Sequence, residues 1–262
     1  MLLLLLLLSC NGDEEPPGCA PEGSFREISI GSHHGCALTT EGLPVCWGRI
    51  GDASDPTDPF MDVQANGQSS CGLKRTGALE CWGQTQWTAP RGEFVELSLG
   101  YNRGYAIKTD GQGVIWDSDE EHEAEGPLTL VSGGVDHFCA VREDGSSYCI
   151  DITSQPPQAE WTQLESSDGY TCGRTVTGTL SCWGSIGEAE IPTPPDGEGW
   201  LDIAPGWSHF CALDAGGAIL CEGIEEPPEL EEGIWVDVGS GQDWACGLDD
   251  AGSIHCWGDC PA

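Results

Sequence analysis

The residues of this chain best suited to chemistry are its 15 cysteines, most of which recur at one fixed spacing. The paired cysteines, each separated by nine residues, are Cys36 and Cys46, Cys71 and Cys81, Cys139 and Cys149, Cys172 and Cys182, Cys211 and Cys221, and Cys246 and Cys256. Thiols at this density favour disulfide formation in an oxidising compartment. A zinc site is not expected, because the sequence has no C-x2-C motif.

Each cysteine pair brackets a glycine, and this pattern predicts a β-hairpin. With the first cysteine as position 0, position +6 is glycine in seven successive units: Gly42, Gly77, Gly111, Gly145, Gly178, Gly217 and Gly252. If positions +4 to +6 form a three-residue loop, the last of them adopts the left-handed conformation that suits glycine. Positions 0 and +10 then form a non-hydrogen-bonded pair with Cα atoms about 4.5 Å apart, close enough for a cross-strand disulfide.

The third unit tests this interpretation, because it lacks both cysteines and has Tyr105 and Ile115 instead. Loss of both partners together is what a bonded pair predicts. The alternative is that these positions hold reduced, buried cysteines. We therefore expect six hairpin disulfides.

The repeated units predict a β-propeller. Position 0 recurs at intervals of 33 to 39 residues, and an apolar segment such as "REISIG" or "VDVGSG" precedes each hairpin. Each unit thus supplies at least three short strands, and radial closure of such sheets leaves few exposed edges. A linear β-solenoid is the alternative, but its parallel coils would not use hairpin turns. The expected repeats are 25–59, 60–93, 94–127, 128–160, 161–199, 200–234 and 235–262.

The units "GSHHGCALTTEGLPVCWG" and "GWSHFCALDAGGAILCEG" resemble the repeat of the regulator-of-chromosome-condensation family. This resemblance covers residues 25 to 259 and implies an all-β, seven-bladed propeller; the cysteine spacing described above would then place one disulfide in six of the seven blades. The cysteine pairs are similar to a variant found in bacterial secreted and surface proteins. The units are shorter than the eukaryotic ones and lack their "GQLG" tail. The nuclear namesake binds chromatin and acts on a small GTPase, functions that the resemblance does not carry to an exported acidic chain.

The N-terminus resembles a bacterial lipoprotein signal. The leucine run Leu2 to Leu8 is too short to span a bilayer, and it ends in "LLSC" at Cys10. We expect a signal at 1–9, lipid on Cys10 and a polar tether at 10–24, although no basic residue precedes Arg26. An ordinary secretory signal is the alternative. The expected location is the bacterial cell envelope, extracytoplasmic and lipid-anchored at the outer membrane or cell surface, or secreted.

Two cysteines remain, Cys19 and Cys260, one at each end of the repeats. If Cys10 carries lipid, a disulfide between these two would join the first blade to the last.

Three histidines recur at position −2: His34, His137 and His209. They could face a central shaft and bind a metal, but they belong to the repeat signature, so hydrogen-bonded turn residues are the preferred interpretation. The acidic segments "DASDPTDP", "DSDEEHEAEG" and "EEPPELEEG" could hold calcium. None has the EF-hand spacing, so solvated loops are preferred. We expect no metal and no cofactor.

Tryptophans divide into two groups. Those at position +11 follow the repeat and are expected in the core: Trp47, Trp82, Trp116, Trp183 and Trp257. Trp161, Trp200 and Trp235 precede new inner strands and are also expected to pack. Trp87, Trp207 and Trp244 fall near strand ends or loops, where exposed aromatic residues suit a binding face.

The net charge of the chain limits the classes of partner that it could bind. Nine Lys and Arg oppose 44 Asp and Glu, a formal charge of −35, which excludes nucleic acid and disfavours anionic lipid. No motif of a hydrolase, P-loop or dinucleotide-binding protein occurs in a convincing context. The expected function is binding of a protein partner, and the negative charge of the chain favours a cationic partner. We expect the protein to be a monomer that contacts the membrane only through its lipid. The alternatives are a propeller lyase or hydrolase with a site over the shaft, and a structural surface protein.

Overall fold

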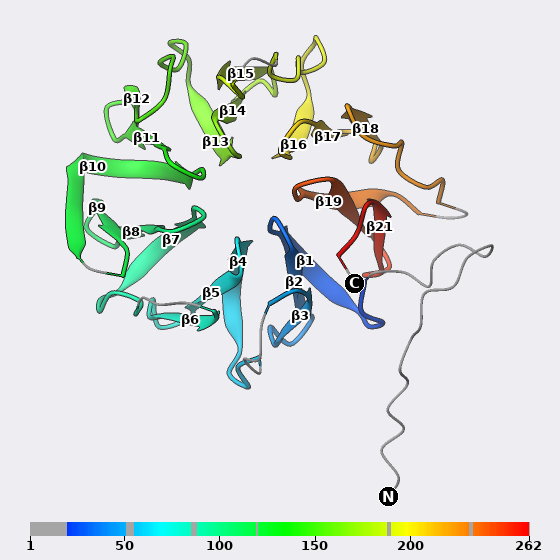
Figure 1. The fold of residues 1–262 in the computed structure, drawn as a ribbon, viewed down its shortest axis with the longest axis horizontal. Helices are drawn as coiled ribbons and strands as arrows, with labels where there is room; N and C mark the ends of the chain where they lie inside the picture. Colours follow the sequence, from blue (N-terminus) through cyan, green and yellow to red (C-terminus); the bar gives the residue numbers. More distant parts are fainter. Residues whose placement is uncertain are drawn as a thin grey trace, which may run out of the picture.

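Twenty-one β-strands surround a central shaft in the computed structural model of this chain (Figure 1). The structure describes residues 20–50, 55–84, 88–118, 120–187, 190–230 and 233–261. The strands form seven blades of three, each in the order inner, middle, outer. Within these described ranges, no helix has the length and apolar character needed to cross a membrane. The all-β, seven-bladed propeller expected from the repeats is thus confirmed.

Each class of strand occurs once in every blade. The inner strands are β1 (Phe25–Ile30), β4 (Phe60–Asn66), β7 (Phe94–Leu99), β10 (Glu121–Gly133), β13 (Trp161–Ser166), β16 (Trp200–Pro205) and β19 (Trp235–Ser240). The middle strands are β2 (His34–Thr39), β5 (Ser69–Lys74), β8 (Gly104–Lys108), β11 (Phe138–Arg142), β14 (Tyr170–Thr175), β17 (Phe210–Asp214) and β20 (Trp244–Asp249). The outer strands are β3 (Pro44–Gly48), β6 (Leu79–Gly83), β9 (Gln112–Trp116), β12 (Ser147–Ile150), β15 (Leu180–Gly184), β18 (Ile219–Glu222) and β21 (Ile254–Gly258).

The hairpin between middle and outer strands has the predicted geometry. In the first blade, Thr39 N donates to Leu43 O at 2.9 Å, and Gly42 N donates to Thr39 O at 2.8 Å. These bonds define a three-residue loop whose last residue is Gly42, with φ of 86°. The six equivalent glycines have φ from 76° to 86°. Only a residue without a Cβ adopts this backbone at little cost.

All six hairpin disulfides are present, and each joins a middle strand to the outer strand of the same blade. Their Cα–Cα distances are 4.0 to 4.1 Å, as expected for non-hydrogen-bonded pairs. In the third blade Tyr105 and Ile115 pair in the same register without a bond. The prediction of paired cysteines is therefore confirmed.

One acidic segment differs from expectation. The segment that begins at Asp117 was expected to be a solvated loop, but Glu121 onward belongs to strand β10. The first part of β10 pairs with β9, with Glu123 opposite Val114, and its last part pairs with β11 in the fourth blade. Two blades therefore share one six-stranded sheet. Ala124 is buried while its neighbours Glu123 and Glu125 are exposed. The segment therefore pairs with the edge strand β9 and keeps its charged side chains in solvent.

The hydrophobic core lies between adjacent blades. Leu38 of the first blade packs in one cluster with Phe60, Val63 and Trp82 of the second. The position +11 tryptophans follow the core prediction, since four are buried and Trp47 is half-buried. Trp161 and Trp235 are buried and Trp200 is half-buried against a core cluster, as expected.

The seam between the last and first blades uses the same contact as other seams. Phe25 N donates to the hairpin glycine Gly252 at 2.9 Å, as Phe60 N donates to Gly42 at 2.8 Å. The first and last blades lie side by side in Figure 1. Cys10 and Cys19 lie outside the described residues, so the lipid and the Cys19–Cys260 disulfide stay predictions. Cys260 packs against the core cluster at this seam.

Candidate binding site at the shaft mouth

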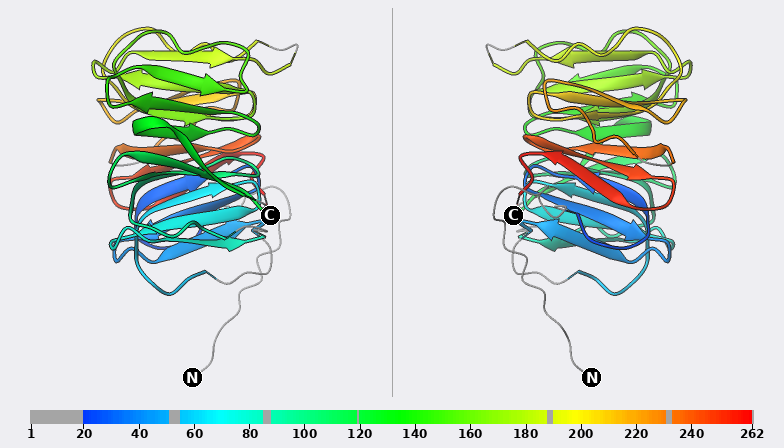
Figure 2. Two further views of the ribbon diagram at one scale, coloured as in Figure 1. Left: turned by 90° about the vertical axis from the view of Figure 1, so that its left-hand side faces the viewer. Right: turned by 90° about the vertical axis from the view of Figure 1, so that its right-hand side faces the viewer.

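The propeller has two distinct faces, seen edge-on in Figure 2. We call the loop face the one formed by the segments between inner and middle strands: 31–33, 67–68, 100–103, 134–137, 167–169, 206–209 and 241–243. The turn face is the opposite one, which carries the seven hairpin turns. The antiparallel pairing of β1 with β2, with Ile30 opposite Gly35 and Phe25 opposite Thr39, places these features at opposite ends of the strands.

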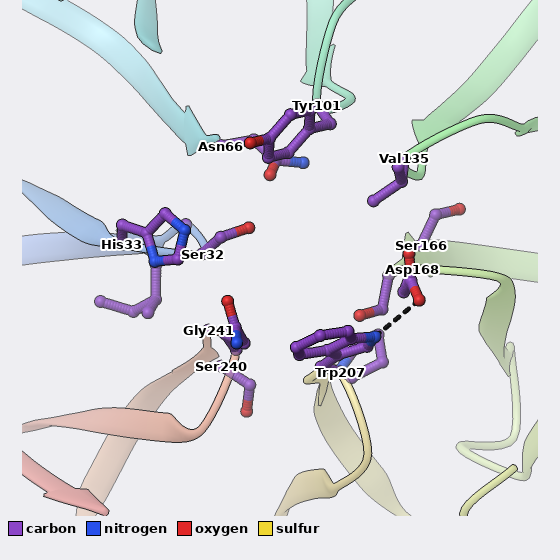
Figure 3. A pocket seen from close by; sticks show the side chains of 15 residues that line it. Ser32, His33, Asn66, Tyr101, Val135, Ser166, Asp168, Trp207, Ser240 and Gly241 are labelled. Atoms are coloured by element: carbon purple, nitrogen blue, oxygen red, sulfur yellow. Dashed lines mark hydrogen bonds between the residues drawn. The ribbon is translucent and has the colours of Figure 1, made fainter. Parts of the chain in front are cut away.

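A cavity of about 270 Å³ opens at the centre of the loop face. Tyr101, Val135 and Trp207 give it apolar walls, and His33 and Asp168 add polar groups. Figure 3 shows Tyr101 and Trp207 on opposite sides of the opening. Both rings are accessible, with exposed fractions of 40% for Tyr101 and 45% for Trp207. Large exposed aromatic residues over a concave site are typical of a binding surface.

Trp207 is held in place by its neighbours. Its indole Nε1 donates to Asp168 Oδ2 at 2.6 Å (Figure 3). The preceding carbonyl, of Gly206, accepts from Ser167 Oγ at 2.6 Å and from Tyr170 Oη at 2.9 Å. The fifth blade thus fixes both the backbone and the ring of a residue in the sixth, so the ring is pre-organised.

Below this mouth lies the shaft, a polar cavity of about 310 Å³. The mouth leads into the shaft, because the two cavities share the lining residues Ile30, Asn66, Ser166, Pro205 and Ser240. The carboxyl-bearing residues that line the shaft are Glu27, Asp62, Glu165, Asp202 and Asp237. Four of them, Glu27, Asp62, Asp202 and Asp237, share position −9 of the repeat, which is the third residue of each of their inner strands. The ring of acids is therefore a property of the repeat.

The acids at position −9 also join neighbouring blades. Glu27 Oε1 accepts a hydrogen bond from Val63 N of the next blade at 2.9 Å. Glu96, at the same position in the third blade, accepts from Val131 N at 2.8 Å. These carboxyls thus satisfy backbone amides that face the shaft.

Confinement in the shaft raises the pKa of its acids. Burial is the largest cause, and it raises the pKa of Glu27 and Glu165 to about 8 and that of Glu96 to about 7. Nearby carboxyls add to the effect, Asp62 on Glu27 and Asp202 on Glu165. The shaft therefore disfavours further negative charge, and a cation that entered it would be stabilised by these acids.

The position −2 histidines lie between blades. Nε2 of His34 is 2.8 Å from Ser70 Oγ, and Nε2 of His137 is 2.9 Å from Thr171 Oγ1. Both partners occupy position −1 of the next blade, which explains the hydrogen-bonded role predicted for these residues. At His209 the partner position is Ala245, and Nε2 of His209 makes no hydrogen bond. Burial lowers the pKa of His34 and of His209 to about 4, so both are neutral at pH 7.

A metal site does not emerge from this arrangement. Across the residues that the structure describes, no group of three or more His, Cys, Asp or Glu side chains could hold a metal ion.

The expectation that Trp244 belongs to a binding face is wrong. Trp244 is 1% exposed and packs edge-on against Trp47, with ring centroids 6.5 Å apart. It occupies position −2, like His34, and this position points into the interface between blades. Trp87 lies outside the described residues. Trp207 does reach the surface, and the sequence analysis missed its companions Tyr101 and Asp168.

The turn face carries a different set of exposed side chains. Met61, Val95, Leu201 and Val236 occupy the second position of four inner strands and are all exposed. They make this face a rival surface for a partner, with apolar side chains in place of a mouth that opens over an acid-lined shaft.

The fold and this site define the chain as a seven-bladed propeller. In structure it is similar to the CRINKLY WD40 ectodomain of the Arabidopsis thaliana receptor kinase ACR4, at 21% identity and a TM-score of 0.75, covering 92% of this chain and 98% of that one. It is also similar to the ectodomain of the Physcomitrella patens receptor kinase CR4, at 20% identity and a TM-score of 0.76, covering 91% and 74%.

A third similar structure bears on the repeat. Prp20p of Saccharomyces cerevisiae, the yeast RCC1 protein, shares 13% identity and a TM-score of 0.70, covering 87% of this chain and 81% of that one. The likeness is consistent with the repeat fold expected from the sequence, and at these identities it establishes the fold alone. No protein-family model and no curated protein matches the sequence.

Proposed function

We propose that this chain is an extracytoplasmic protein-binding propeller whose loop face binds a cationic surface of a partner. The observation that carries the proposal is the pair of exposed rings, Tyr101 and Trp207, around a cavity that opens over an acid-lined shaft. A formal charge of −35 would steer such a partner toward the chain.

Similar propellers support a protein partner in general terms. Prp20p was characterised for binding to Gsp1p and histones, and yeast RCC1 was crystallised with Kap60 bound. Two of the similar plant structures are ectodomains. The six disulfides suggest an oxidising environment, which agrees with an extracytoplasmic location. Attachment to a bacterial envelope through lipid on Cys10 is part of the proposal, and mass spectrometry of the mature N-terminus tests it.

The enzyme alternative would place a lyase or hydrolase site over the shaft. It draws on the shaft carboxyls, but Glu27, Glu96 and Asp237 accept hydrogen bonds from backbone amides of neighbouring blades. The recurring histidines that could serve as acid or base are buried between blades, as His34 and His137 show. This arrangement favours binding over catalysis. A structural surface protein without a dedicated ligand is the third candidate.

The test is a pull-down from the native cell envelope with matched variants of the two faces. The loop-face variant is Tyr101→Ala with Trp207→Ala, and its control on the turn face is Leu201→Ala with Val236→Ala. We expect one partner that wild type and the turn-face variant retain and the loop-face variant loses. Loss only in the turn-face variant would place binding on the other face, and absence of any specific partner would favour a structural role.

A further inference from the structure

We infer that the mouth cavity takes a single lysine side chain of the partner, with its ammonium group directed down the shaft. This inference rests on the proposed function and names the chemical group that the loop face recognises. The cavity has room for a side chain rather than a folded segment, since its volume is about 270 Å³. Its walls combine apolar rings with the carboxyl of Asp168, and the acid-lined shaft lies below; this suits an aliphatic stem that ends in a cation.

The mouth supplies aromatic faces for the cation and its stem. Tyr101 and Trp207 lie across the opening from one another (Figure 3). A Lys ammonium or its adjacent methylenes over the face of Trp or Tyr gains from the ring quadrupole. The hydrogen bond from Trp207 Nε1 to Asp168 fixes the indole and leaves a carboxylate at the rim, where it attracts a cation before entry.

The depth of the site matches a lysine. Glu165 is at position −7 of its blade, near the end of the inner strand β13. It lies two residues before Ser167, the first residue of the loop-face segment that follows this strand. Two residues of a strand span about 7 Å, a depth that the four-carbon stem of lysine can follow. Glu165 is thus the first shaft acid below the mouth, since the acids at position −9 lie two residues deeper.

The path to Glu165 is lined by small polar groups. At position −7 four of the other blades have Ser29, Gln64, Ser98 and Ser132, and the remaining two have Ala204 and Gly239; all six line the shaft. The side-chain oxygens of the four polar residues can accept the three donors of an ammonium group. Burial, and after it the nearby carboxyl of Asp202, raises the pKa of Glu165, and an ammonium there would favour the ionised form of this carboxyl. A planar guanidinium would need a coplanar acceptor pair, and the mouth offers Asp168, which is already engaged by Trp207.

The experiment measures binding of small probes to the whole chain by calorimetry and by NMR. The probes are Nα-acetyl-lysine methyl ester, its norleucine and Nε-acetyl-lysine analogues, and Nα-acetyl-arginine methyl ester. We expect the lysine probe to bind at least about tenfold more tightly than the neutral analogues and more tightly than arginine. The variants Trp207→Ala and Glu165→Gln should each weaken the lysine probe by about threefold to tenfold.

Controls separate this site from general attraction to an acidic chain. Glu41→Gln, which removes an exposed acid on the turn face, should leave the lysine probe unchanged, and so should Val236→Ala. Folding of Trp207→Ala is checked by its thermal transition, and Glu165→Gln serves as a second variant that preserves the shape of the shaft. Equal binding of the norleucine probe, tighter binding of arginine, or no effect of either site variant would overturn the inference.

Failure here is distinguishable from failure of the proposed function. If the partner binds the loop face but the lysine probe does not bind, the protein-binding role stands and the lysine assignment falls. If the probe binds but no partner is captured, the cavity is an amine site and the protein-binding role falls. Acetylation of the lysines of a captured partner should abolish its capture if both hold.

Discussion

The carboxylate of Asp237 in the last blade accepts a hydrogen bond from the backbone N–H of Ile28 in the first, at 3.0 Å. The two residues are 209 positions apart in the sequence. Asp237 Oδ1 also accepts from its own neighbour, Val238 N, at 2.9 Å. The side chain of Asp237 therefore joins the last blade to the first. The contact is equivalent to the one that Glu27 makes between the first and second blades.

Removal of this carboxyl should weaken the ring at its seam. Asp237→Ala leaves Ile28 N without its acceptor in the shaft wall, and we expect a loss of about 1–3 kcal/mol in the free energy of unfolding. Asp237→Asn keeps an acceptor oxygen and removes a carboxyl whose pKa is raised by burial and by the nearby Asp202, so that its ionised form is disfavoured; the variant should be at least as stable as wild type at pH 8. Urea titration measures both, with Glu41→Gln as the surface control. Equal losses for the Ala and Asn variants would contradict this account.

The shaft acids predict an acidic optimum of stability. Glu27, Glu96 and Glu165 have pKa values of about 7 to 8 in the folded chain against 4.5 as the ordinary value. The folded state therefore binds more protons than the unfolded state between these values, and stability rises as pH falls from 8. His34 and His209, with folded pKa of about 4, act in the opposite direction below pH 6.5.

We expect the thermal midpoint to rise from pH 8 to a maximum at about pH 4.5 to 5, where the two His offset the three Glu, and to fall below it. The double variant Glu27→Gln and Glu165→Gln should flatten the limb above pH 6 and leave the acidic limb in place. A midpoint that increases steadily up to pH 8 in wild type would show that the shaft carboxyls are ionised at little cost.

Each hairpin disulfide should stabilise its blade locally. The loop that Cys71 and Cys81 close is short, so the chain-entropy model gives about 2.5–3 kcal/mol for the bond. Replacement of both cysteines by serine should lower the free energy of unfolding by up to that amount. The native third blade, with Tyr105 and Ile115, shows that the hairpin forms without the bond. Peptide mapping without reduction checks the pairings, and links between different blades would refute them.

The seam offers a second, covalent test. Ala20 and Cys260 both pack against the core cluster that contains Phe25 and Trp244, which brings the residue after Cys19 to the same region as Cys260. We expect a Cys19–Cys260 disulfide in the mature chain, and its loss in Cys19→Ser should lower stability at the seam. A thiol at Cys260 that reacts with iodoacetamide in the native, unreduced protein would rule it out.

Local rules predicted the blades well. The glycine at position +6 follows from turn stereochemistry alone, and the register of Cys36 with Cys46 follows from counting outward from that turn. The same logic applies in all seven units, so repetition made the prediction secure. Strand β10 differed from the prediction of a solvated loop. An acidic segment can still form a strand when its charged side chains face solvent, as Glu123 does.

The site was less predictable, because it depends on where a position points after the ring closes. Trp207 and Trp244 have similar sequence surroundings, yet position −2 turns Trp244 into an interface and position −4 leaves Trp207 at the mouth. The acid that recurs at position −9 could have been recognised in the sequence, but it was hidden among the many other acidic residues of the chain. Tyr101 and Asp168 come together only through the radial arrangement of the third and fifth blades.

The most direct measurement is site-specific photo-crosslinking in the native envelope, with a benzophenone amino acid at Tyr101 on the loop face or at Met61 on the turn face. Both positions are exposed to a similar extent, 40% and 44%, so they are matched in access. The account predicts a discrete protein adduct from position 101 and none from position 61. An adduct from position 61 alone, or none from either, would contradict the claim that the loop face binds a protein partner.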